Sequence, residues 1–297
     1  MRHKIGFLGL LLALAVTGLH GESTPLIRKR VSEVQFTLVA TDPNGRPLPR
    51  LSPADITVLE DGRPIPHFEL RSGADLPLRV GVVLDLSDST RRSWVAVRGA
   101  LIQSLEQILR PKDELLVLAF NSRIEMEQTI SDPAQLETAL EHPESGGLTA
   151  LYDTIYQTCN QAIFAGDQEP HRSALIVFSD GEDDISLHGL NEAIANAELS
   201  GISTYTVSTH NPKLQTRGDG VLQEIAEATG GRAFVVKNVA QLQEALAAID
   251  QELRSSYLLY YRPPEEIGSR AFRRVHVVPT QRDGSQVRSR AGYFTTP

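Results

Sequence analysis

The sequence predicts an α/β protein, with a doubly wound, mostly parallel sheet inserted in or flanked by a small antiparallel β module. In the middle of the chain, short continuous apolar runs alternate with stretches of helical periodicity, which is typical of parallel strands covered by helices. Near both ends, apolar and polar residues alternate instead, as in strands with one solvated face. A chain of 297 residues has room for about two such domains.

Residues 1–21 predict a secretory signal peptide. Arg2 and Lys4 form a basic start, and a mainly apolar run follows from Ile5 to Leu19. This run is shorter than the roughly 20 residues that a bilayer span needs, although an uncleaved signal anchor is the alternative. We therefore expect export to the periplasm or the extracellular space, with no stable membrane span after signal cleavage.

Residues 22–75 predict an N-terminal β module. The segment EVQFTLVATD alternates in polarity and is followed by the turn cluster Asp42–Gly45. Two further strands are expected at 56–59 and 65–72, with prolines placed between the strands, where a missing N–H does little harm.

Residues 76–254 predict the doubly wound domain. Its buried strands are expected at 78–86, 114–120, 173–180, 202–208 and 232–236, with a short antiparallel neighbour at 124–130. Helices are expected after the first strand from Trp94, around 151–159, at 190–199, through Leu222 and Ile225, and at 239–253.

Residues 255–297 return to β character. Runs at 256–263, 272–280 and 286–294 are expected to be strands that pair with the N-terminal module. The α/β domain would then be an insertion in that module, which requires its two ends to lie close together, as domain ends commonly do.

Composition excludes several classes of function. The chain has 29 Lys+Arg against 37 Asp+Glu, a net charge of −8, so it lacks the basic surface that general nucleic-acid binding needs. The lone Cys159, expected to be an inert core residue, excludes an intramolecular disulfide framework and cysteine-clustered metal sites. The sequence also contains no P-loop, no GxSxG elbow and no HExxH motif.

Polar side chains at the expected strand ends form a candidate metal site. Asp85, Ser87 and Ser89 follow the first buried strand, and Asp180 follows the third. Thr149 comes after a glycine pair and just before a helix. Ligands of open parallel sheets bind at the carboxyl ends of the strands. These hard oxygen donors suit Mg²⁺, and Mn²⁺ or Ca²⁺ can substitute.

This pattern resembles the metal-ion-dependent adhesion site (MIDAS) of von Willebrand factor type A (VWA) domains. The D-x-S-x-S motif matches at Asp85, Ser87 and Ser89, and the family's threonine and second aspartate match Thr149 and Asp180. The flanking β segments look like those of exported bacterial members. The resemblance implies a non-enzymatic adhesion or interaction module whose metal ligates an Asp or Glu of a partner protein.

Other interpretations stay open at this point. Asp, Ser and Thr after strands can simply cap helices, and the acidic run 182–184 is expected to be a solvated loop rather than a second cation site. Two other functions remain: a scaffold component of a cell-envelope complex, and a metal-assisted hydrolase. The hydrolase would need a general base beside the bound water, a role for which only Asp88 or Glu182 could be proposed.

Overall fold

The computed structural model describes residues 33–90, 94–108, 110–130, 132, 134–140, 146–161, 171–208, 217–263, 272–281 and 283–295. The expected signal peptide, residues 1–21, lies outside this part of the chain, so export stays a prediction. No helix of the described residues is long and apolar enough to cross a membrane.

A six-stranded sheet forms the α/β layer and confirms the predicted fold class. Its strand order is β10-β9-β8-β5-β6-β7, and all neighbouring strands are parallel except β7, which pairs antiparallel with β6. The strands are β5 (Leu78–Asp85), β6 (Glu114–Phe120), β7 (Ile124–Ile130), β8 (Arg172–Ser179), β9 (Ser203–Ser208) and β10 (Ala233–Val235). These bounds lie within a few residues of the apolar runs that predicted them.

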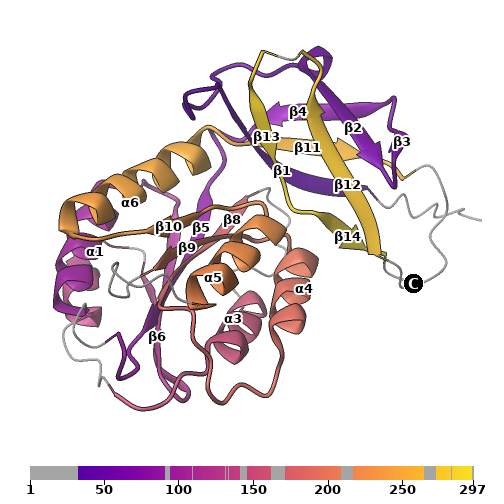
Figure 1. Cartoon of the computed structure of the whole chain (residues 1–297). Coiled ribbons are helices and arrows are strands. Elements are labelled where there is room, and N and C mark those ends of the chain that lie inside the picture. Colours follow the sequence, from indigo (N-terminus) through magenta and orange to yellow (C-terminus); the bar gives the residue numbers. More distant parts are fainter. Residues whose placement is uncertain are drawn as a thin grey trace, which may run out of the picture. The chain divides into compact units, whose positions relative to one another are not determined.

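Helices cover both faces of this sheet (Figure 1). Side chains of α1 (Trp94–Ile108) and α6 (Val239–Arg254) belong to the core on one face. Side chains of α3 (Leu151–Cys159), α4 (Leu190–Ser200) and α5 (Arg217–Ala228) belong to the core on the other. The short helix α2 (Ala134–Ala139) follows β7.

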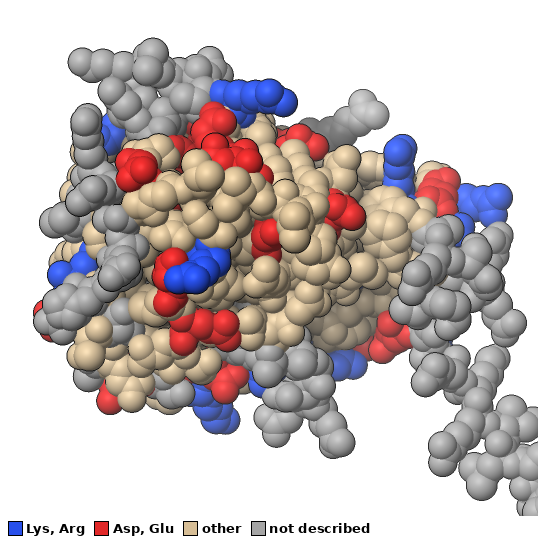
Figure 2. Space-filling view, turned by 90° about the horizontal axis from the view of Figure 1, so that it is seen from below, with Lys and Arg blue, Asp and Glu red and all other residues tan. Residues whose placement is uncertain are grey.

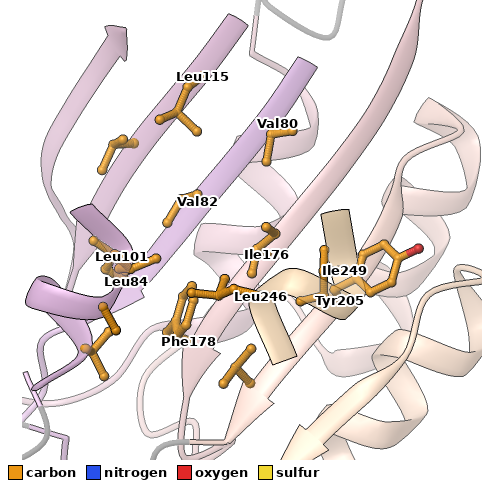
Figure 3. Close-up of a cluster of buried hydrophobic side chains, with 14 of the residues drawn as sticks. Val80, Val82, Leu84, Leu101, Leu115, Ile176, Phe178, Tyr205, Leu246 and Ile249 are labelled. Atoms are coloured by element: carbon orange, nitrogen blue, oxygen red, sulfur yellow. The ribbon is translucent and has the colours of Figure 1, made fainter. Parts of the chain in front are cut away.

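The spacing of apolar residues explains how α6 packs. Leu242, Leu246, Ile249 and Leu253 recur every three or four residues, so they form one stripe, and all are buried. Figure 3 shows Leu246 and Ile249 of this stripe near Phe178 and Tyr205 of the sheet. The Asn238 side chain accepts a hydrogen bond from the Gln241 amide (3.0 Å) and so fixes where α6 begins.

Cys159 belongs to the core on the other face of the sheet, as expected for an inert thiol. Its side chain is buried, and this burial raises the pKa of the thiol to about 12. The reactive thiolate is therefore not formed near neutral pH.

Strands from both ends of the chain pair in two four-stranded antiparallel sheets. One sheet has the order β13-β1-β11-β4, and the other has the order β14-β12-β2-β3. The strands are β1 (Val34–Thr41), β2 (Ile56–Glu60), β3 (Arg63–Pro64), β4 (Phe68–Ser72), β11 (Tyr257–Tyr261), β12 (Phe272–Pro279), β13 (Gln286–Arg288) and β14 (Gly292–Phe294). Their buried side chains form a separate core that includes Phe36, Leu259 and Val275.

The run 286–294, expected as a single extended segment, divides into β13 and β14, which belong to different sheets. The corner between them contacts the α/β layer. Ala291 donates its amide hydrogen to the Ala228 carbonyl (3.0 Å), and Arg290 Nη1 donates to the Glu198 carbonyl (2.8 Å). Local polarity does not reveal this corner, because the contacts that fix it come from residues distant in the sequence.

The two connections between the antiparallel sheets and the α/β layer lie side by side. Gly73 donates its amide hydrogen to the Ser256 carbonyl (2.8 Å). The buried Arg172 guanidinium donates to the carbonyl of Leu76, on the connection that leads into β5, and to the carbonyl of Leu253, in the last turn of α6. The chain thus enters and leaves the α/β layer at one place, as an inserted domain requires. The domain boundaries at 76 and 254 stay a prediction.

Candidate metal site

The candidate metal site lies at the carboxyl edge of the six-stranded sheet. Asp85 is the last residue of β5, and Asp180 comes directly after β8. These strands are adjacent, parallel and paired up to Leu84 opposite Phe178. Asp85 and Asp180 therefore emerge next to each other, at the edge where open parallel sheets bind ligands.

Asp85 is held in a fixed position by hydrogen bonds to both carboxylate oxygens. Oδ1 accepts from the Ser87 amide (2.9 Å), and Oδ2 accepts from the Ser179 hydroxyl (2.6 Å). The residue is only 5% exposed. Burial raises the pKa of Asp85 to about 6; the negative charge of Asp180 adds to this rise, while the two serines oppose it.

The serine hydroxyls of the motif lie together. Ser87 Oγ and Ser89 Oγ are 3.1 Å apart, with Ser87 buried and Ser89 exposed. The Thr90 hydroxyl donates to the backbone carbonyls of Asp85 (2.7 Å) and Ser87 (3.2 Å). Thr90 thereby closes the loop that presents the two serines.

A second loop carries Thr149 and is hydrogen-bonded to the first. The Gly146 amide donates to the Leu86 carbonyl (2.7 Å), and the Asp88 backbone amide donates to the Gly147 carbonyl (3.2 Å). Gly146 and Gly147 have φ values of +132° and +96°, which favour glycine. Thr149 is 2% exposed, and none of the hydrogen bonds among the described residues uses its hydroxyl.

The third loop, which carries Asp180, is bonded to the second. Asp184 Oδ2 accepts from the Thr149 amide (2.9 Å), and the Asp184 amide donates to the Thr149 carbonyl (2.8 Å). Asp183 Oδ1 accepts from the Tyr152 amide in the first turn of α3 (3.1 Å). The acidic run was expected to be a solvated loop. Glu182 and Asp184 are indeed exposed. In addition, Asp183 and Asp184 position the Thr149 loop and the start of α3, where negative charge is favourable.

Two glycines bring the start of α5 against the Asp180 loop. A Cβ added at Gly218 would lie 2.0 Å from the Asp180 carbonyl oxygen, and one added at Gly181 would lie 2.2 Å from the Gly218 carbonyl oxygen. Both contacts are shorter than side chains allow, and Gly181 also has φ +81°. The backbone around Asp180 is thus fixed by close packing as well as by hydrogen bonds.

Sequence reasoning did not single out Ser179, Asp183 or Asp184 as parts of the site. Ser179 is the last residue of a buried strand and sits directly before Asp180, so its position alone was a usable signal. The roles of Asp183 and Asp184 depend on where α3 begins in space, and no local pattern indicates that.

The donor set fits a small, hard divalent cation. Two buried carboxylates of like charge lie beside the serine hydroxyls of the motif, and a cation would offset their mutual repulsion. Among the described residues, no group of three or more His, Cys, Asp or Glu side chains could hold a metal ion. Ligation would therefore rely on two carboxylates, hydroxyls and retained water, a set typical of Mg²⁺.

Comparisons with known proteins show the fold. No family model matches the sequence, and no curated protein is significantly similar to it. The solved von Willebrand factor type A structure from Catenulispora acidiphila superposes with a TM-score of 0.51 at 13% sequence identity, covering 80% of this chain and 73% of that one. At this identity the likeness establishes a shared fold and leaves function to be argued from the site.

Two further solved structures are less similar overall. BatB from Bacteroides thetaiotaomicron has a TM-score of 0.47 at 22% identity, covering 60% of this chain and 100% of that one. An aerotolerance-related membrane protein from Bacteroides fragilis has a TM-score of 0.48 at 22% identity, covering 59% of this chain and 98% of that one.

Proposed function

We propose that this chain, whose α/β layer has the von Willebrand factor type A fold, is an exported protein-binding module that acts through a divalent cation. The cation would be Mg²⁺, with Mn²⁺ or Ca²⁺ as substitutes, held by Asp85, Ser87, Ser89, Thr149 and Asp180. The partner would be a protein that presents an Asp or Glu side chain. The module would have no catalytic activity of its own.

The observation that carries this proposal is the direct linkage of the three loops. The Gly146 amide is hydrogen-bonded to the Leu86 carbonyl on the first loop, and the Thr149 amide is hydrogen-bonded to the Asp184 carboxylate on the third. Residues that are far apart in the sequence are thereby held at one edge of the sheet. A capping role for each residue separately does not account for this arrangement.

Each residue has a distinct role in this proposal. Asp85 and Asp180 supply the negative charge that attracts the cation, and Ser87 and Ser89 offer neutral oxygens. Thr149, buried and with its hydroxyl uncommitted among the described residues, completes the site when a ligand binds. A bound divalent cation supplies a positive centre with positions open to a carboxylate from the partner.

The first test is calorimetric titration of residues 22–297 with Mg²⁺ and Mn²⁺. We expect saturable one-to-one binding that is lost in Asp85→Ala. Asp88→Ala is the matched control, because it removes the same charge from an exposed carboxylate three residues away. Absence of binding to the wild type, or equal loss in both variants, would contradict the metal site.

Thr149→Ala separates partner binding from a scaffold role. The probe is a displayed library of short peptides with a fixed central aspartate between random residues. We expect the variant to keep its thermal stability and to lose capture of the peptides selected by the wild type. A loss of stability without a change in peptide capture would favour the scaffold. Hydrolytic turnover abolished by chelation would favour an enzyme.

A further inference from the structure

Exposed apolar side chains lie on two of the loops that form the candidate metal site. Leu148 is 53% exposed, Ile185 is 39% exposed and Leu187 is 92% exposed. We call these three residues the apolar rim. Large apolar side chains exposed close together on loops often mark an interaction surface.

Sequence position and hydrogen bonds place Leu148 and Ile185 beside Thr149, and Leu187 beside the first turn of α3. Leu148 directly precedes Thr149, and the Ile185 amide donates to the Thr149 carbonyl (3.2 Å). Two residues further along, the Leu187 amide donates to Asp153 Oδ2 in the first turn of α3 (2.9 Å). The rim therefore lies on the side of the site formed by the Thr149 and Asp180 loops.

The three loops that carry the candidate ligands bear exposed acidic side chains, and two exposed basic residues border them, Arg123 after β6 and Arg217 at the start of α5. Asp88, Glu182 and Asp184 are all exposed on the loops that carry the candidate ligands. Figure 2, which views the molecule from below, shows acidic side chains, with some basic ones among them, dispersed over a largely uncharged surface. An acidic segment with many charges would be repelled by these three carboxylates, whereas a single carboxylate could be held by the cation.

We propose that the partner is a protein segment that presents one Asp or Glu flanked by apolar side chains, which pack on Leu148, Ile185 and Leu187. This inference rests on the proposed function, because the carboxylate is the group that the cation would ligate. The carboxylate would set the position of the segment, and burial of the apolar rim would supply much of the affinity.

The same peptide library tests this inference. Selection on the wild-type protein in Mg²⁺ should enrich apolar residues next to the fixed aspartate and disfavour acidic ones. A selected peptide should bind roughly tenfold more weakly to Leu187→Ser, since burying a leucine side chain contributes about that much affinity. Leu148→Ser should also weaken binding of this peptide.

Leu199→Ser is the matched control. The exposed fraction of Leu199 is 56%, similar to the 53% of Leu148, but Leu199 lies on α4, outside the three loops. This variant should bind the selected peptide as the wild type does. Because all the substituted side chains are exposed, each variant should unfold at the wild-type temperature, which reports on folding independently of binding.

The outcomes separate this inference from the proposed function. Aspartate-dependent and Mg²⁺-dependent capture without apolar enrichment, or with unchanged affinity in the rim variants, overturns the rim inference alone. Failure to capture any aspartate peptide in a Mg²⁺-dependent manner overturns both. Enrichment of strongly acidic peptides would show that charge, and not apolar contact, selects the partner.

Discussion

Ser179 controls the geometry of the most buried carboxylate in the candidate site. Its hydroxyl donates to Asp85 Oδ2 at 2.6 Å and also accepts from the Gly181 amide at 3.0 Å. One side chain thus couples the end of β5 to the loop that carries Asp180. Groups that orient metal ligands in this way often contribute tenfold or more to affinity.

We therefore predict that Ser179→Ala weakens Mg²⁺ binding by about tenfold to a hundredfold. The variant keeps every proposed ligand, so a loss of Mg²⁺ affinity would come from Asp85 Oδ2, which no longer accepts the hydrogen bond of Ser179. Calorimetric titration gives the affinity, and circular dichroism verifies the fold. Wild-type Mg²⁺ affinity in the folded variant would show that this hydrogen bond does not position Asp85.

The buried Glu198 should make the stability of the protein depend on pH. Burial raises the pKa of its carboxyl group to about 7, and the positive charge of Arg290 opposes this rise only in part. The native state therefore binds this proton more tightly than the unfolded chain does. Its contribution to stability is present below the unfolded pKa of 4.5 and is lost as pH rises through 7.

Glu198→Gln should remove this loss. We expect the free energy of unfolding of the variant to exceed that of the wild type by up to about 3 kcal/mol at pH 8 and by much less at pH 5. Urea denaturation at the two pH values measures this difference. The exposed Glu224→Gln on α5 is the control, with no comparable gain expected. A gain of equal size at both pH values would rule out titration as the cause.

At the element scale, the close approach of α5 to the Asp180 loop depends on glycine. We predict that Gly218→Ala moves the first turn of α5 away from Asp180, because its Cβ would lie 2.0 Å from the Asp180 carbonyl oxygen. Stability should fall by about 1–3 kcal/mol, and Mg²⁺ affinity should fall with it.

Gly220→Ala is the matched substitution in the same helix. No heavy atom lies within 4 Å of its added Cβ, so we expect stability to stay the same or to rise by up to about 1 kcal/mol. Chemical denaturation and calorimetry of both variants test the comparison. Equal effects at the two positions would mean that helix propensity, and not contact with the Asp180 loop, governs the result.

At the scale of the whole molecule, charged and backbone contacts join the antiparallel sheets to the α/β layer. Arg288 pairs with the buried Glu252 of α6, and its Nη1 donates to the Gly231 carbonyl (2.8 Å). Arg290 bonds both to the Glu198 carbonyl and to the Gln35 carbonyl (2.8 Å each). We expect these contacts to make the two parts unfold together.

Mg²⁺ should therefore stabilise the whole chain in one transition. At a concentration one hundred times the dissociation constant, the free energy of unfolding should rise by about 2.7 kcal/mol. Chelation should reverse the effect, Asp85→Ala should abolish it, and Asp88→Ala should keep it. Differential scanning calorimetry tests this; two separated transitions, only one of them sensitive to Mg²⁺, would show that the parts unfold independently.

Much of the architecture follows from local sequence. Continuous apolar runs predicted strands such as β5 and β6 because both faces of these strands are covered. The stripe ending at Leu253 predicted α6 because helical periodicity places such residues on one side. The order of strands and helices, together with strand-end polar residues, also predicted where Asp85 and Asp180 would lie.

Tertiary structure decided what local sequence does not contain. The corner at 289–291 forms because Arg290 and Ala291 bond to α4 and to the end of α5. Asp183 and Asp184 serve the Thr149 loop and α3 only once that loop is folded beside them. The apolar rim exists because Leu148, Ile185 and Leu187 stay exposed in the folded protein, which their sequence context does not indicate. Periodicity reports which face of an element is buried, whereas such contacts depend on elements distant in sequence coming together.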